Sequence, residues 1–170
     1  MYVLPELIKR NLSGAFFLSR VVIEEDKLLD VNAIHHILSK TSNRKSLVSD
    51  LYEHCLNNGV SQVQLNSYYK DFGVPGRWDD ADTIFIKRML QHVLPENLRN
   101  LITTSLFEKY VGRSTQELSS KLYMNIQEVR TLVKKGMYIG SHGSMHYRLD
   151  RISDEKQKEA YGQIDRTHRR

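Results

Sequence analysis

Apolar residues recur at helical spacing over most of the chain, which predicts a mainly helical protein. A first helix is expected over residues 2–11, where Pro5 is tolerated in the first turn and Gly14 follows the end. Residues 30–135 then read as one helix after another, interrupted by the turn at Gly73, Val74, Pro75 and Gly76. The expected apolar stripes in this region include Val31, Ile34, Ile37, Leu38; Leu47, Leu51, Cys55, Leu56; Ile84, Phe85, Met89, Val93; and Leu98, Leu101, Ile102, Leu106, Tyr110.

Two short segments break this helical pattern and predict strands. Residues 15–18 and 137–139 are continuous apolar runs bounded by turn residues, a pattern typical of strands buried on both faces in a parallel sheet. The expected fold class is therefore α/β. It consists of two neighbouring parallel strands with a large, mostly helical insertion over residues 30–135.

The second predicted strand leads directly into a pair of histidines. Gly140 and Ser141 end the apolar run, and His142 and His146 follow at positions i and i+4. A helical turn after the strand would place both imidazoles on one face, where they can bind a divalent ion with Zn–N distances of about 2.0–2.1 Å. His142 and His146 are therefore the candidate metal ligands.

This segment resembles the second motif of the polysaccharide deacetylase family, which shares the chitooligosaccharide-deacetylase homology domain. The motif is carried by Ser141, His142 and His146, followed by Leu149 and a helix start at residues 153–155, Ser-Asp-Glu. Residues 2–18 resemble the family's first helix and second strand. The chain departs from the family at Gly143, where Ser or Thr is usual, and Ser144 follows one place later. Ser141 and Ser144 are expected to support the loop.

The resemblance implies a fragment of a parallel (β/α) barrel. Residues 1–29 and 136–165 would be barrel segments, residues 30–135 the insertion and residues 166–170 a tail. It also implies metal-dependent hydrolysis of N-acetyl groups on a carbohydrate, with zinc as the usual metal. The family's aspartate motif and later motifs are missing, so little or no activity is expected from the chain alone. Asp79, Asp80 and Asp82 follow Trp78 and could replace the missing acids, but a helix cap is favoured.

Two other functions remain open. Residues 114–135 resemble a helix-turn-helix whose second helix carries Arg130, Lys134 and Lys135. The turn lacks glycine, and Ser114 with Glu117 fits a simple capping box, so a helical hairpin is favoured and nucleic acid is not expected as a partner. The second alternative is a non-catalytic helical interaction domain.

The remaining chemically distinctive residues have ordinary structural explanations. His35 and His36 are sequence neighbours that point about 100° apart on a helix, and His54 and His92 are single histidines on polar helix faces. Tyr68 and Tyr69 could stack against sugar rings or bases, or could anchor a helix on its neighbours. The sequence leaves this choice open.

Composition limits the class of protein without identifying it. The 170 residues are 40% hydrophobic and 26% charged, which is typical of one soluble globular domain, and the net charge is +5. No apolar run approaches the ~20 residues that span a bilayer, and no signal peptide is recognisable. The single cysteine, Cys55, favours a cytoplasmic setting. The strand at residues 15–18 is expected to keep one unpaired edge, which favours self-association.

Overall fold

The computed structural model describes residues 2–143, 149 and 152–162. The chain divides into two compact units, residues 1–29 with 116–170 and residues 30–115. In chain order the elements are α1 (Val3–Lys9), β1 (Ala15–Leu18), α2 (Arg20–Glu24), α3 (Asp30–Lys40), α4 (Arg44–Asn57), α5 (Gln62–Phe72), α6 (Ala81–Arg88), the π-helix η1 (Met89–Val93), α7 (Glu96–Val111), α8 (Thr115–Leu122), α9 (Ile126–Lys134), β2 (Tyr138–Ser141) and α10 (Asp154–Gly162).

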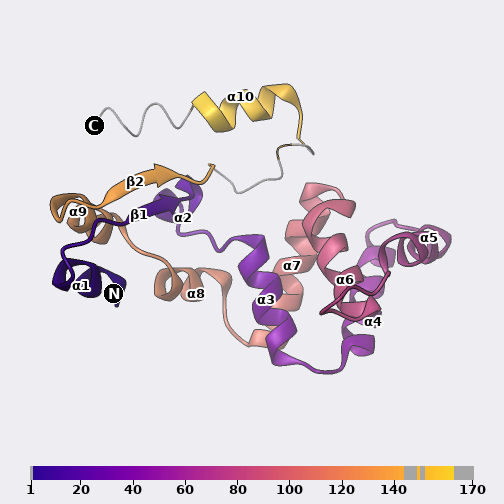
Figure 1. Ribbon diagram of the computed structural model, residues 1–170. Helices are drawn as coiled ribbons and strands as arrows, with labels where there is room; N and C mark the ends of the chain where they lie inside the picture. The colour runs from indigo at the N-terminus through magenta and orange to yellow at the C-terminus, as the bar shows by residue number, and fades with distance from the viewer. Residues whose placement is uncertain (1, 144–148, 150–151, 163–170) are drawn as a thin grey trace. The chain divides into compact units, whose positions relative to one another are not determined.

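The two predicted strands exist and pair in parallel (Figure 1). Phe16 is opposite Ile139 and Phe17 is opposite Gly140 in the two-stranded sheet. The pairing begins with a bond from Tyr138 N to Gly14 O of 2.9 Å and ends with one from His142 N to Leu18 O of 2.8 Å. The expectation of two neighbouring parallel strands in an α/β chain, separated by a helical segment, is thus confirmed.

The prediction that the first strand is buried on both faces is wrong. Phe16 and Ile139 pack against a small core of Leu4, Leu132 and Met137, contributed by α1, α9 and the residue before β2. On the opposite face Phe17 is 59% exposed and Tyr138 58% exposed. An apolar run has no polar residue to mark its open face, so the pattern could not distinguish one covered face from two.

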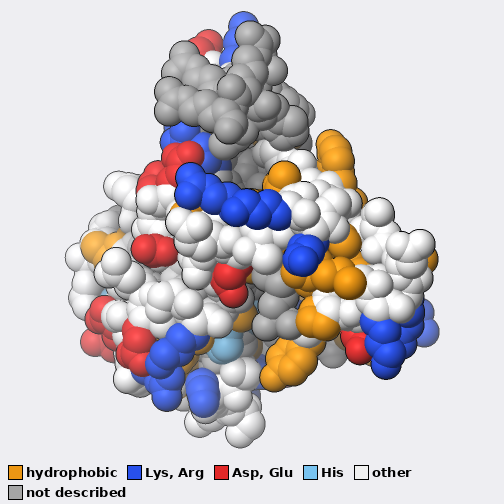
Figure 2. Space-filling model, turned by 90° about the vertical axis from the view of Figure 1, so that its left-hand side faces the viewer, with side chains coloured by type: hydrophobic (Ala, Val, Ile, Leu, Met, Phe, Trp, Pro, Cys, Tyr) orange, Lys and Arg blue, Asp and Glu red, His pale blue; other side chains and the backbone are white. Residues whose placement is uncertain are grey.

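Exposed apolar side chains also lie on the helices of this unit. Figure 2 views the molecule from the side of α1 and α9 and shows hydrophobic side chains, in orange, at the surface. Large apolar side chains more than 40% exposed on α1, α8 and α9 include Val3, Ile8, Leu122, Ile126 and Val133. The helix predicted over residues 2–11 is shorter than expected, at Val3–Lys9.

The second unit has its own helical core. Helix α3 packs mainly on α7, while α4 packs on both α6 and α7. The predicted stripes supply this core, because Ile34, Leu51, Phe85 and Leu106 have no exposed surface. Large apolar side chains from successive helices therefore meet at one centre, as amphipathic helices require.

The helix predicted to run through Val93 changes its geometry part of the way along. Helix α6 ends at Arg88, and the next turn, Met89–Val93, is a π-helix. Leu94 is extended, with φ −73° and ψ 153°, and Pro95 then precedes α7. Proline disfavours a helical residue before it, which explains why the helix stops at this point.

The unit boundary falls before the last two helices of the expected insertion. Residues 116–134, with most of α8 and all of α9, cluster with the strands, whereas the sequence pattern placed residues 30–135 together. The short helix α2, which buries Val21 and Val22, was not anticipated. Among the described residues no helix is long and apolar enough to cross a bilayer.

Candidate functional site

His142 lies directly after β2, at the carboxyl edge of the parallel pair. Two hydrogen bonds hold the backbone of His142. Its N–H donates to the carbonyl oxygen of Leu18, the last residue of β1, at 2.8 Å, and Ser19 Oγ donates to His142 O at 3.3 Å. Ser19 is 6% exposed, so this second contact is sheltered from water. His142 as a residue is exposed. An exposed histidine on a fixed backbone thus lies at this edge.

The next residues form a tight turn that Ser141 supports. Gly143 N donates to Ser141 Oγ at 3.2 Å, and Arg20 N donates to Gly143 O at 3.4 Å. Gly143 has a φ of +77°, in the left-handed region that favours glycine. Glycine at the position where the resembled family usually has Ser or Thr is therefore consistent with the local backbone.

The other half of the expected metal site lies outside the described residues. This applies both to His146 and to Ser144. Among the residues that are described, no three His, Cys, Asp or Glu side chains gather closely enough to hold a metal. The geometry of the His142 and His146 pair therefore remains a prediction from the sequence.

The three acids after Trp78 have structural partners. Asp80 caps α6, with its carboxylate accepting from Thr83 N at 2.7 Å, and this bonding lowers the pKa of Asp80. Asp79 pairs with Lys87 Nζ at 2.6 Å, and Asp82 accepts from Tyr69 OH at 2.5 Å. Asp80 thus has the predicted capping role, and its neighbours bind other side chains.

The histidines elsewhere in the described part of the chain belong to the other compact unit, residues 30–115. His35 is exposed, and His36 is its partly buried neighbour on α3. His54 Nε2 lies 3.1 Å from Ser105 Oγ, which links α4 to α7. His92 belongs to η1 and has its Nδ1 buried.

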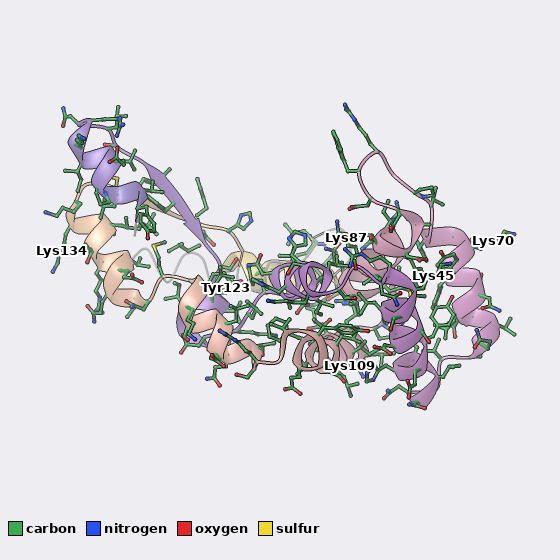
Figure 3. All side chains as sticks on the ribbon, turned by 90° about the horizontal axis from the view of Figure 1, so that it is seen from below. Lys45, Lys70, Lys87, Lys109, Tyr123 and Lys134 are labelled. Carbon is green, nitrogen blue, oxygen red and sulfur yellow. The ribbon has the colours of Figure 1, made fainter. Side chains whose placement is uncertain are left out.

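A capping box that was not predicted from the sequence stabilises the start of α9, the second helix of the α8–α9 hairpin. Asn125 Oδ1 accepts from Glu128 N at 3.0 Å, and Glu128 Oε2 accepts from Asn125 N at 2.9 Å. Figure 3 labels Lys134 on α9 and Tyr123 near the end of α8. Tyr123 OH accepts from Leu29 N at 3.2 Å and so ties the turn to the same unit. Arg130, Lys134 and Lys135 are exposed.

The two tyrosines that could bind sugars or anchor a helix have different surroundings. The Tyr68 ring lies 6.1 Å from Phe72 on the same helix. The Tyr69 ring packs 4.9 Å from the buried Phe85 and borders a surface hollow of about 380 Å³. Tyr52, which no sequence signal singled out, lines the same hollow. Tyr52 and Tyr69 both pack on Phe85 of another helix, so no local pattern could have predicted that they line one hollow.

Comparison with known proteins adds no relative to this description. No family model, curated protein or solved structure matches the chain.

Proposed function

We propose that this chain is a polysaccharide deacetylase-like protein that holds a divalent metal ion, with zinc the first choice, through His142 and His146. The proposed reaction is hydrolysis of N-acetyl groups on a carbohydrate. The single observation that supports it most strongly is the position of His142, on a fixed backbone at the carboxyl edge of two parallel strands. Open α/β sheets bind their ligands at that edge.

The local chemistry is suited to a metal ligand. His142 is an exposed residue, so an ion can approach it, while its hydrogen bonds with Leu18 O and Ser19 Oγ restrict its backbone. When a metal-binding side chain is already restricted before the ion binds, less conformational entropy is lost on binding. A zinc ion held here with a full set of ligands would lower the pKa of its bound water to about 7 and would polarise a carbonyl group.

Two imidazoles make an incomplete set for catalysis. A catalytic zinc normally takes three protein ligands and keeps one position for water or substrate. The proposal therefore requires a further ligand, and a carboxylate is the chemistry that the resembled family would supply. Without that ligand we expect weak zinc binding and little turnover.

Zinc calorimetry tests the metal site directly. We expect the unaltered chain to bind zinc and both His142→Ala and His146→Ala to weaken binding by roughly tenfold or more. His35→Ala is the matched control, because His35 is also exposed but lies on α3 in the other unit. Equal affinity in the unaltered chain and in His142→Ala would remove the proposed site.

A deacetylation assay tests the reaction separately. Release of acetate from an N-acetylated oligosaccharide, dependent on zinc and lost in His142→Ala, would support the proposal. Zinc binding without any detectable acetate release would favour the alternative of a non-catalytic helical domain.

A further inference from the structure

One face of α4 lines two neighbouring surface hollows within the helical unit, which together are called the groove below. Two hollows of about 460 and 380 Å³ share Lys45, Val48 and Tyr52 in their linings and are therefore neighbours on α4. The first extends along α4 to Asn57, and the second reaches Tyr69 on α5 and Asp82 on α6. From Lys45 to Asn57 the helix rises about 18 Å, which is long enough for an extended ligand.

We propose that this groove, floored by α4 and bordered by Tyr52, Tyr69 and Asp82, binds a short, uncharged oligosaccharide. The ligand class rests partly on the proposed deacetylase function, whereas the groove belongs to residues 30–115 and does not include the histidine pair. It would act as a carbohydrate-binding surface in addition to the proposed metal site.

The aromatic rings of the groove are fixed before any ligand binds. Tyr52 and Tyr69 both pack on the buried Phe85, with ring centroids 5.9 and 4.9 Å away. Their hydroxyl groups are already used, because Tyr52 OH donates to Leu65 O at 3.2 Å and Tyr69 OH donates to Asp82 at 2.5 Å. What remains for a ligand is the part of each ring that lines the hollow, and the negative π face of an aromatic ring attracts the C–H groups of a sugar ring.

Polar side chains along the floor supply the hydrogen bonds that a sugar needs. Among the described residues, Lys45, Ser49, Glu53 and Asn57 line the groove without engaging another side chain in a hydrogen bond or ion pair. They offer both donors and acceptors, which matches the mixed donor and acceptor character of sugar hydroxyl and amide groups. Figure 3 labels Lys45 on α4 in this part of the unit.

The charge of the groove disfavours polyanions. Lys45 is opposed by the carboxylates of Glu53 and Asp82, so the lining has no excess of positive charge. Nucleic acids and sulfated glycans depend on such an excess for most of their affinity. Rigid rings with balanced polar groups therefore favour a neutral sugar over either.

An NMR titration of the full chain with chitotetraose tests this inference. Saturable shifts should cluster on α4, α5 and α6. Tyr52→Leu, which keeps an apolar filler but removes the ring, should weaken binding by roughly tenfold, whereas Tyr52→Phe should bind almost unchanged. Circular dichroism checks that each variant keeps its helices.

A second pair of variants covers the case in which Tyr52→Leu unfolds. Glu53→Ala removes an exposed acceptor from the groove and should weaken binding, whereas Glu108→Ala removes an exposed carboxylate from α7 outside it and should not. Absence of saturable shifts, shifts confined to residues 116–143, or tighter binding of a heparin oligosaccharide would each overturn the inference. His142→Ala should weaken zinc binding by roughly tenfold or more and leave chitotetraose binding intact, so the two proposals fail independently.

Discussion

The ring of Phe17 lies directly over Gly140, its partner across the two strands. A Cβ atom at position 140 would come within 2.5 Å of Phe17 Cδ1, much closer than side-chain atoms normally approach. The glycine therefore makes room for an aromatic ring on the open face of the sheet, where Tyr138 meets the same ring edge-on at 6.2 Å between centroids.

This contact predicts that Gly140→Ala destabilises the first unit. Alanine in place of glycine normally stabilises a strand by about 0.5–1 kcal/mol, but overpacking costs about 1–3 kcal/mol, so the clash should dominate. Denaturant unfolding followed by circular dichroism measures the difference. In a Phe17→Ala background the ring is gone, and Gly140→Ala should become neutral or stabilising. An equal loss in both backgrounds would contradict the assigned contact.

Removing the capping box should weaken α9 and the core that it supports. Asn125→Ala leaves the amides of Gln127 and Glu128 without their side-chain acceptor and is expected to cost about 0.5–2 kcal/mol of unfolding free energy. Asn125→Asp keeps an acceptor and is the matched control. An equal loss of unfolding free energy in both variants would show that the side-chain acceptor at position 125 does not stabilise α9.

The bond between Tyr69 and Asp82 should make stability sensitive to alkali. The carboxylate of Asp82 and burial together raise the pKa of Tyr69 to about 12, above its ordinary value of 10.0. A raised pKa in the folded state stabilises the neutral tyrosine. Its contribution is therefore complete below pH 10.0 and is lost as the pH rises towards 12.

Tyr69→Phe separates this effect from the other tyrosines, since the pKa values of Tyr52 and Tyr110 are also raised, mainly by burial. The free energy of unfolding should fall more steeply in this pH range for the unaltered chain than for Tyr69→Phe. Parallel curves would assign the alkaline loss to other groups.

Cys55 should resist thiol reagents in the folded protein. It has no exposed surface, and burial raises the pKa of its thiol to about 11, so the reactive thiolate is scarce. Labelling should therefore proceed only through opening of α4, at a rate that rises with denaturant. Rapid, stoichiometric labelling of the native chain would show that α4 is not packed as described.

The sequence predicted best where a pattern has a local cause. The two strands, the apolar stripes of the helices and the helix cap at Asp80 could be predicted because each depends on residues that are close together in the sequence. The open face of β1 was missed because Ala15, Phe16, Phe17 and Leu18 are all apolar, although Phe17 faces outward. The sequence marked Tyr69 as a possible sugar-stacking residue but not the groove, because Tyr52 and Tyr69 come together by packing on Phe85, a residue of another helix.

The pairing of β1 with β2 has a consequence for how the protein folds. Ser19 and His142, which meet at the end of the sheet, are separated by 123 positions in the sequence. Closing so long a loop costs entropy before any contact repays it, whereas the helices between the strands gain contacts locally. The helical unit should therefore collapse first and shorten the effective loop. The sheet, and with it the placement of His142, should be among the last features to form.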